Sequence, residues 1–322
     1  MSNRFFLCGE INIAYRPVMV DFRELETFFW VATLGSFRGA AAKLNTTQPA
    51  ISQRVAALEA QLGVRVLSRE TRAIAPTPRG RELLVYAEKL LGLRAEMLEA
   101  VGDVSTARGV LRLGVAETVV HTWLTPFLKA VSDRFPQLAL EIEVDISPNL
   151  RERLRVQELD LAFLIGPLNA PNAQKLPLAV YPLAFISSPT IEWPKRAARI
   201  EEVAQHPIVT FSRNTQPYSV VASLFNRPHM PPARLHASAS LATVVRMTVE
   251  NLGVAVIPPA IVAGELRRGE LRIVRCEAKL PDLVFDANWV ESIGSRTAAA
   301  VAAIAATVAK ASIDRPRTKR LS

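Results

Sequence analysis

The sequence predicts a multidomain α+β protein with an N-terminal winged helix-turn-helix domain, a long linker helix and a C-terminal two-lobed α/β domain. Three observations lead to this prediction. Residues 36–63 read as two short helices joined by a tight polar turn, residues 79–101 read as one uninterrupted helix, and residues 110–257 read as strands that alternate with helices. A length of 322 residues gives room for two or three domains.

The stretch 36–63 has the caps and the apolar spacing of two packed helices. Ser36 can cap the first helix and Thr47 the second, where Pro49 falls in the first turn and loses no hydrogen bond. The second helix ends at Gly63 and carries one apolar stripe, formed by Ile51, Val55, Leu58 and Leu62. An upstream helical stripe is expected to complete a three-helix core, with Leu25, Phe28, Phe29, Ala32 and Leu34.

The opposite face of the second helix is polar, with Gln48, Ser52, Gln53 and Arg54. Two helices with a short polar turn, the second presenting amides, a hydroxyl and an arginine near its start, are typical of a helix-turn-helix. Caps and apolar stripes also occur in any helical domain, so the spacing alone leaves DNA binding and a purely structural role both open.

The longer sequence around these helices favours DNA binding. Residues 44–69 (LNTTQPAISQRVAALEAQLGVRVLSR), followed by Pro76-Thr77-Pro78-Arg79-Gly80, closely resemble the DNA-binding domain of the LysR-type transcriptional regulators, and residues 22–37 resemble its first helix. Two positions depart from the family pattern: Leu67 stands where an aromatic residue is usual, and Pro76 stands where a leucine usually precedes the threonine.

The resemblance implies the residues that meet DNA. Gln48, Pro49 and Ser52 occupy positions that meet base edges in the family, and Arg54 occupies one that meets phosphate; glutamine can pair with adenine through two hydrogen bonds. We expect Ser36, Thr47 and Gln53 in the same interface. Residues 64–78 fit a two-stranded wing, whose Arg69 and Arg72 suit phosphates or the minor groove, the alternative being solvated charges on a loop.

Charge and composition agree with a polyanionic partner. The formal net charge is +9, which favours double-stranded DNA. No run of about 18 uncharged apolar residues occurs, so no membrane partner is expected. The two cysteines, Cys8 and Cys276, suggest no disulfide framework, as expected for a cytoplasmic protein. Residues 1–20 make a poor signal peptide and are predicted to be a disordered leader, and residues 312–322 a basic tail.

Residues 79–108 are predicted to form a linker helix and a hinge between domains. Its apolar residues follow a heptad-like pattern: Leu83, Leu84, Ala87, Leu90, Leu91, Met97, Leu98 and Val101. Such a stripe needs a partner, so we expect Leu84, Leu91 and Leu98 to lie between two subunits of a homodimer or homotetramer.

Strands and helices alternate through residues 109–311. Strands are expected at 110–115, 138–144, 160–165, 178–187, 207–211 and 254–257, and helices at 123–135, 150–157, 241–251 and 298–311. In the second strand, Leu138, Leu140, Ile142 and Val144 are predicted to point inward. This order is that of two doubly wound α/β units.

Two such units resemble the effector-binding domain of LysR-type regulators, which has the fold of periplasmic solute-binding proteins. The resemblance implies lobe I at about 109–180 and 288–311 and lobe II at about 181–287, and it extends over residues 21–311 in all. Because open sheets bind ligands at the carboxyl ends of strands, the effector site is predicted at Thr118, Ser147, Ser212 and Arg213. Arg213 could hold a carboxylate, so a polar or anionic effector is expected, although Glu117 would repel an anion; each hydroxyl could instead be an ordinary helix cap.

The predicted function is therefore a sequence-specific DNA-binding transcriptional regulator that responds to a small-molecule effector. The alternative is a solute-binding α/β protein whose helical appendage does not bind DNA. Enzyme activity is not expected, because the chain contains no G-x-x-x-x-G-K-S/T, G-x-G-x-x-G or G-x-S-x-G sequence. The four histidines, at 121, 206, 229 and 236, show no metal-binding spacing, so no catalytic residue, cofactor or metal is predicted.

Overall fold

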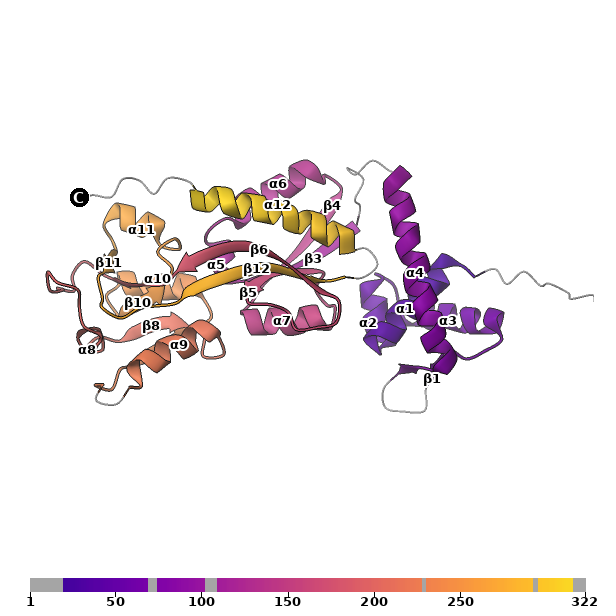
Figure 1. Cartoon of the computed structure of the whole chain (residues 1–322), viewed down its shortest axis with the longest axis horizontal. Helices are drawn as coiled ribbons and strands as arrows, with labels where there is room; N and C mark the ends of the chain where they lie inside the picture. Colours follow the sequence, from indigo (N-terminus) through magenta and orange to yellow (C-terminus); the bar gives the residue numbers. More distant parts are fainter. Residues whose placement is uncertain (1–19, 69–73, 102–108, 228–229, 292–294, 315–322) are drawn as a thin grey trace, which may run out of the picture. The chain divides into compact units, whose positions relative to one another are not determined.

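The computed structural model describes residues 20–68, 74–101, 109–227, 230–291 and 295–314. The chain divides into two compact units, residues 1–94 and 95–322, which are described separately (Figure 1). Several predicted features lie outside the described residues: the leader up to residue 19 with Cys8, the wing arginines Arg69 and Arg72, the hinge at 102–108 and the tail from residue 315.

The N-terminal unit contains the predicted three-helix core, made by α1 (Phe22–Leu34), α2 (Phe37–Lys43) and α3 (Gln48–Leu62). The caps lie where the sequence predicts them: Ser36 Oγ accepts a 3.1 Å hydrogen bond from Gly39 N, and Thr47 Oγ1 accepts one of 3.4 Å from Ala50 N. Gly63 ends α3 in the left-handed region, with φ +68°. The buried stripe of α1 is wider than predicted, because Trp30 and Val31 are buried while Ala32 and Leu34 are partly exposed.

The predicted wing follows α3. Its strands are β1 (Leu67–Ser68) and β2 (Ala75–Pro76), which pair antiparallel. Glu59 in α3 accepts hydrogen bonds from Val66 N at 2.8 Å and Leu67 N at 3.2 Å, so the carboxylate holds the base of the wing against α3. Leu67, where the family usually has an aromatic residue, is 3% exposed and serves as a core residue.

The linker helix is α4 (Pro78–Val101), and its inward face differs from the prediction. Ala87 and Leu91 are buried, and the Arg94 guanidinium lies over the Phe22 ring of α1, 5.5 Å from the centroid. These three positions are four and three residues apart, so they share one helix face, and this face packs on the chain's own N-terminal unit. The prediction that Leu91 faces another subunit is therefore wrong; the Leu98 side chain lies outside the described structure.

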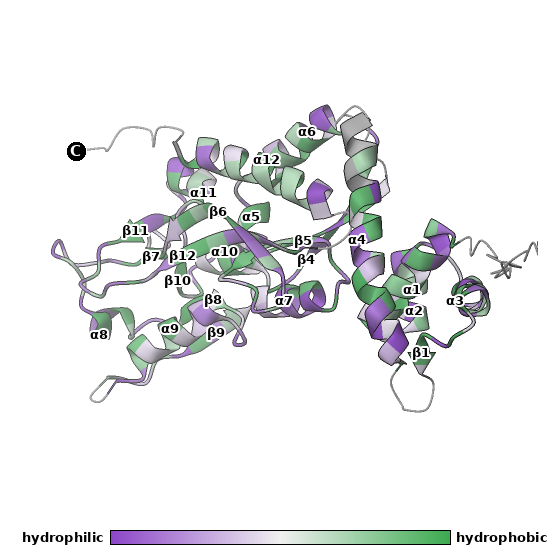
Figure 2. Cartoon of the chain, turned by 45° about the vertical axis from the view of Figure 1, so that its right-hand side comes forward, coloured by the Kyte–Doolittle hydropathy of each residue, from purple (hydrophilic) through white to green (hydrophobic). Residues whose placement is uncertain are grey.

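Hydrophobic and hydrophilic residues both occur along α4 (Figure 2), and a second set of its apolar side chains is exposed. We call this surface the exposed α4 stripe; its residues are Tyr86, Leu90, Leu93 and Met97, exposed by 63%, 48%, 63% and 56%. Their spacings of four, three and four are those of a coiled-coil seam. At 100° per residue, this stripe lies roughly 120° around the helix from the face of Leu91.

Lobe I of the C-terminal unit is built on a five-stranded sheet with the order β4-β3-β5-β12-β6. β3 pairs parallel with β4 and β5, while β12 pairs antiparallel with β5 and β6. Helices α6 and α12 cover one face and α7 the other (Figure 1). The strands are β3 (Gly109–Val115), β4 (Leu138–Val144), β5 (Leu161–Ile165), β6 (Ala173–Pro182) and β12 (Asp282–Val290), and the helices are α5 (Glu117–Val120), α6 (Leu124–Arg134), α7 (Ser147–Arg155) and α12 (Ser295–Asp314).

Lobe II has its own five-stranded sheet, with the order β11-β7-β10-β8-β9. β8 pairs parallel with β9 and β10, whereas β7 pairs antiparallel with β10 and β11. The strands are β7 (Ala184–Ser187), β8 (Ile208–Phe211), β9 (Leu235–Ser238), β10 (Val254–Ile257) and β11 (Arg272–Val274), and the helices are α8 (Ile200–Val203), α9 (Gln216–Phe225), α10 (Leu241–Val249) and α11 (Ala263–Arg268).

The chain crosses between the lobes at points that the sequence pattern does not reveal. The single strand predicted at 178–187 is two strands in different sheets, β6 of lobe I and β7 of lobe II, separated by Leu183. The chain returns to lobe I with β12, which begins at Asp282 rather than near residue 288. An apolar run keeps its pattern while it passes from one core to the other, so periodicity does not mark the crossing.

The predicted inward face of β4 is only partly covered. β4 is an edge strand of its sheet, and Ile142 and Val144 are 38% and 52% exposed, although both were predicted to point into the core. Leu138 and Leu140, earlier in the same strand, are partly buried and pack against the core. The end of β4 thus remains open in the isolated chain.

One described helix, α12, is long and apolar enough to cross a membrane by length and composition, with a mean hydropathy of 1.3 over residues 295–313. In the structure α12 lies along β6, β12 and α6. Its buried side chains are small, and they allow a close approach to the sheet: Ala298, Val301, Ala302, Ala305 and Ala309. These contacts are those of a helix that covers the core of lobe I.

Candidate functional site

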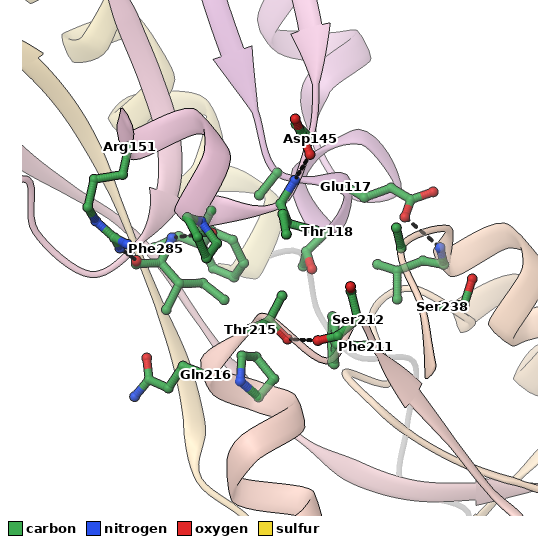
Figure 3. Close-up of a pocket in the computed structure, with 18 residues that line it drawn as sticks. Glu117, Thr118, Asp145, Arg151, Phe211, Ser212, Thr215, Gln216, Ser238 and Phe285 are labelled. Carbon is green, nitrogen blue, oxygen red and sulfur yellow. Dashed lines mark hydrogen bonds between the residues drawn. The ribbon is translucent and has the colours of Figure 1, made fainter. Parts of the chain in front are cut away.

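A cavity of about 170 Å³ lies between the two lobes of the C-terminal unit (Figure 3). Lobe I lines it with the segments that follow β3 and β4, and lobe II with those that follow β8 and β9. Within each lobe these strands are parallel neighbours, so their carboxyl ends meet at one edge of the sheet. The cavity therefore has the position at which open α/β sheets bind ligands.

Three of the four predicted effector residues line this cavity: Thr118, Ser147 and Ser212. Thr118 is 3% exposed, and its hydroxyl points into the space between the lobes (Figure 3). Ser147 Oγ accepts a 3.0 Å hydrogen bond from Ile165 N, which leaves the hydroxyl proton able to bond a ligand. The hydroxyls of both lobes thus face one volume.

Arg213, the fourth predicted residue, does not line the cavity. It is exposed, and its guanidinium lies over the ring of Tyr218, 5.7 Å from the centroid. Thr215, which caps α9 through Tyr218 N, sets the course of the preceding loop, and this loop presents Ser212 to the cavity and Arg213 to solvent. The prediction that Arg213 holds an effector carboxylate is wrong for this geometry.

Two charged residues of the cavity wall were not predicted, Arg151 and Asp145. Arg151 donates to the carbonyl oxygens of Ile165 at 2.6 Å and Pro167 at 3.1 Å, so its charge lies beside the cavity and two of the guanidinium's five N–H donors are used by the backbone. Asp145 Oδ1 accepts from Ile146 N at 2.7 Å at the start of α7. In the sequence both residues read as ordinary solvated charges next to a helix.

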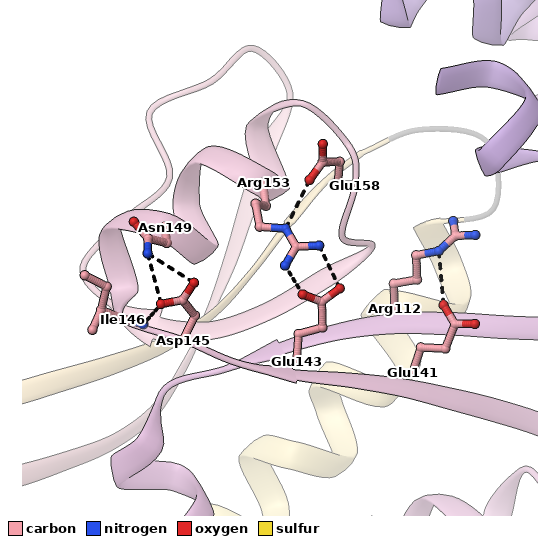
Figure 4. A network of polar contacts seen from close by, with 8 residues as sticks. All are labelled: Arg112, Glu141, Glu143, Asp145, Ile146, Asn149, Arg153 and Glu158. Carbon is pink, nitrogen blue, oxygen red and sulfur yellow. Dashed lines mark hydrogen bonds and ion pairs between the residues drawn. The ribbon is translucent and has the colours of Figure 1, made fainter. Parts of the chain in front are cut away.

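An ion-pair network fixes α7 against β4 (Figure 4). Arg153 of α7 donates to Glu143 of β4 at 2.7 Å and to Glu158 at 3.0 Å. A separate pair, Arg112 with Glu141 at 3.3 Å, joins β3 to β4. These pairs connect β3, β4 and α7. Because Asp145 follows β4 and Ser147 begins α7, the pairs help to fix the lobe I side of the cavity.

Glu117 connects the two lobes across the cavity. Its Oε2 accepts a 2.5 Å hydrogen bond from the backbone N–H of Leu241, the first residue of α10 in lobe II (Figure 3). His121 Nε2 lies 3.7 Å from the other carboxylate oxygen. Partial burial by itself raises the pKa of Glu117, but the hydrogen bonds from His121 and Leu241 N outweigh it and lower the pKa below 4.5. The ionised carboxylate is therefore the stable form at this position.

The N-terminal unit presents the predicted reading face on α3. Gln48, Pro49 and Gln53 are exposed, and Ser52 and Arg54 are partly exposed. Ser36 and Thr47 use their hydroxyl oxygens to cap α2 and α3, so both have a structural role first. Exposed arginines that the prediction left out, Arg38 and Arg65, extend the basic surface of this unit.

Comparison with known protein families gives the same division of the chain. Residues 22–81 match the family model described as bacterial regulatory helix-turn-helix protein, lysR family, and residues 105–309 match the LysR substrate binding domain. The chain belongs to the LysR family of transcriptional regulators. It is a LysR-type DNA-binding regulator with an effector-binding domain, and a solute-binding protein with an unrelated appendage is not favoured.

Curated and solved LysR-type proteins resemble the chain over most of its length. A probable hydrogen peroxide-inducible genes activator of Mycobacterium avium is 30% identical over 275 residues, which are 83% of this chain and 86% of that protein. A variant of full-length OxyR from Pseudomonas aeruginosa is 23% identical, with a TM-score of 0.64 over 94% of this chain and 99% of that chain. Full-length LysG from Corynebacterium glutamicum with bound effector Arg is 21% identical, with a TM-score of 0.59 over 90% and 98%.

Proposed function

We propose that this LysR-type regulator binds a pseudo-palindromic DNA site as a homo-oligomer and that a small polar effector in the cavity between its lobes controls this binding. The observation that carries the proposal is the hydroxyl-lined cavity at the strand ends of an α/β unit, in the same chain as an exposed helix-turn-helix face. The proposed location is the bacterial cytoplasm, where the DNA and the effector are both within reach.

The DNA contacts proposed for the reading face follow from its chemistry. The Gln48 amide offers the donor and the acceptor that match adenine in the major groove, and Pro49 offers an apolar surface to a thymine methyl group. Arg54 and the exposed Arg38 and Arg65 suit phosphate oxygens, which supply affinity rather than sequence preference.

The exposed α4 stripe supports the proposed oligomer. Tyr86, Leu90, Leu93 and Met97 form a seam that the chain itself leaves open, and a second copy of α4 would bury it. Two joined copies would present two α3 helices to successive major grooves, which requires a DNA site with two related halves. The stripe serves a dimer and a tetramer equally well.

The size and lining of the cavity set the proposed effector class. An apolar cavity of about 150 Å³ holds benzene, so about 170 Å³ suits a molecule of roughly six to ten non-hydrogen atoms. Ile165, Phe211 and Phe285 supply apolar wall, and Thr118 and Ser147 supply hydroxyls. Arg213 was the residue expected to bind an anionic effector, and it lies outside the cavity.

We propose no catalytic activity for this cavity. The residues that line it include no histidine, cysteine or lysine, so the cavity contains no nucleophile–base pair of the Ser–His or Cys–His type. Among the described residues, no group of three His, Cys, Asp or Glu side chains is placed to hold a metal ion.

The name of one similar protein, the probable hydrogen peroxide-inducible genes activator of Mycobacterium avium, raises peroxide sensing as a second candidate. A disulfide within the effector-binding domain needs two cysteines there, and residues 109–311 contain only Cys276. Partial burial raises the pKa of the Cys276 thiol, which lowers its thiolate fraction and its reactivity. We therefore propose that no intramolecular redox switch operates. Peroxide-dependent DNA binding that reductant reverses and that is lost in Cys8→Ser as well as in Cys276→Ser would contradict this, whereas a response that persists in Cys8→Ser would indicate an intermolecular route.

The experiment that tests the proposed function begins with genomic DNA. Fragments retained by the full-length protein are sequenced and examined for a shared two-part site, and binding is measured again with Gln48→Ala. A library of small molecules is then screened for compounds that shift both the melting temperature and the affinity for the retained fragment. Failure to retain any fragment in preference to bulk DNA would overturn the proposal.

A further inference from the structure

Glu117 is the one residue of the cavity wall whose carboxylate makes a recorded hydrogen bond from lobe I to lobe II. It is the first residue of α5, directly beyond the end of β3, and its side chain is 21% exposed. Besides Leu241 N at 2.5 Å, the Ser240 hydroxyl donates to it. The carboxylate of one lobe thus occupies the N-terminal end of a nine-residue helix, α10, in the other lobe.

The N-terminal end of a helix attracts anions, because its first N–H groups have no partner within the helix and carry partial positive charge. In α10 two of these groups are already bonded by the chain itself: Glu117 accepts from Leu241 N, and Ser240 Oγ accepts from Thr243 N at 3.4 Å. An anionic ligand in the cavity would have to displace the Glu117 carboxylate to bond Leu241 N.

The chain's own groups also bond part of the other positive features of the wall. At α7, Asp145 accepts from Ile146 N, and Pro148 has no N–H to offer. At α9, Thr215 accepts from Tyr218 N, and Pro217 again removes a donor. Arg151, the only Lys or Arg among the lining residues, directs its guanidinium to two backbone carbonyl groups.

We propose that the Glu117 carboxylate occupies the position at the start of α10 where the carboxylate of an anionic effector would otherwise bind. Glu117 thereby restricts this regulator to uncharged or cationic effectors. The proposal rests on the effector-binding role proposed above for the cavity. It assigns Glu117 as a specificity-determining residue.

Charge in the cavity supports this assignment. The lining carries two carboxylates, Glu117 and Asp145, and one guanidinium, Arg151. A third carboxylate would meet two like charges at close range in the cavity, which is unfavourable. An amine could instead approach the Glu117 oxygen that faces His121, and an alcohol or amide could bond the hydroxyls of Thr118 and Ser147.

The test uses matched probes that share a carbon skeleton and differ only in charge: propionate, propionamide and propylamine, and benzoate, benzamide and benzylamine. Binding to the full-length protein is measured by calorimetry for wild type, Glu117→Gln and Glu117→Asp. Glu270→Gln is the control for net charge, because Glu270 lies in lobe II, outside the cavity wall, and pairs with Arg268. Melting temperatures confirm that each variant is folded.

In wild type and in Glu270→Gln, the amides and amines should bind at least tenfold more tightly than the carboxylates. Glu117→Gln should raise carboxylate affinity at least tenfold and change amide affinity by less than about threefold. Glu117→Asp, which keeps the charge in the cavity, should still exclude the carboxylates. If one Glu117 variant does not fold, the other variant and the wild-type affinities for the three kinds of probe still test whether Glu117 excludes carboxylates.

The inference is overturned if wild type binds carboxylates as tightly as amides or if no probe binds Glu117→Gln. It is also overturned if the affinity of Glu117→Gln for carboxylates is no higher than that of wild type. DNA binding is measured on the same protein samples to separate this result from the proposed function. Retained sequence-specific DNA binding without charge discrimination would overturn only the role of Glu117. Loss of specific DNA binding by wild type would overturn the proposed function instead.

Discussion

A Cβ atom on Gly80 would lie 1.9 Å from the carbonyl oxygen of Val66. The start of α4 therefore packs directly against the backbone that leads into the wing. Thr77 strengthens this junction, since its N–H donates to Val66 O at 3.0 Å and its hydroxyl donates to Arg65 O at 2.9 Å. The start of the linker helix and the backbone that leads into the wing are thus held together by close packing and two hydrogen bonds.

Gly80→Ala is expected to destabilise the protein by about 1–3 kcal/mol, because the methyl group would force backbone apart. Gly92, in the same helix, has no atom within 4 Å of the corresponding position, so Gly92→Ala should stabilise α4 by up to about 1 kcal/mol. Denaturant unfolding of the two full-length variants, followed by circular dichroism, measures both effects. Equal stability of the two variants would show that the helix does not approach Val66 this closely.

Gln48→Ala should weaken binding to the specific site by about 1–3 kcal/mol and leave binding to unrelated DNA nearly unchanged, because the amide reads a base edge. Arg54→Ala should weaken both and reduce the salt dependence of binding by about one counterion, because a guanidinium on phosphate adds affinity without sequence preference. Fluorescence anisotropy titrations at several salt concentrations separate the two patterns. Uniform weakening by Gln48→Ala would exclude it as a base reader.

Leu93→Glu should break the oligomer and leave the N-terminal unit folded, because Leu93 lies on the exposed α4 stripe and a second copy would bury the new charge. Leu91→Glu should unfold that unit instead, since Leu91 is 1% exposed within the chain. Light scattering reports the mass and circular dichroism the helix content. A Leu93→Glu protein that keeps the wild-type mass would exclude this stripe as the oligomer interface.

Stability should fall in acid through Glu117. Its pKa is lowered in the fold, so the stabilisation from the ionised carboxylate is present above the ordinary value of 4.5 and is lost as the pH falls through the lower folded value. The difference in unfolding free energy between wild type and Glu117→Gln should therefore be constant from about pH 6 to about pH 5 and shrink below that. A difference that grew in acid would mean that the carboxylate is not held ionised by α10.

Local sequence patterns were sufficient to predict the helices of the helix-turn-helix. Ser36 and Thr47 cap their helices as predicted, because capping depends on a few neighbouring residues. The position of the cavity followed from the strand order, since parallel strands bring their carboxyl ends to one edge. Thr118, Ser147 and Ser212 line this cavity, and their role in effector binding stays a prediction. Arg213 was predicted to line the cavity but does not, because the order of residues in a loop does not determine the direction in which each side chain points.

The sequence by itself determined the two-part organisation of this regulator and the helices of its N-terminal unit, which follow from short-range periodicity. It also determined the edge of the sheets where an effector is proposed to lie, which follows from strand order. It did not reveal α9 or α11 of lobe II. Only the tertiary structure decided which apolar face of α4 packs inward, because Leu91 and Leu93 both fit a heptad and the choice depends on what α1 presents to them. Only the tertiary structure, likewise, brought Glu117 to Leu241, 124 residues away in the chain. That contact forms when two separately folded sheets close on each other, and no spacing within either of them encodes it.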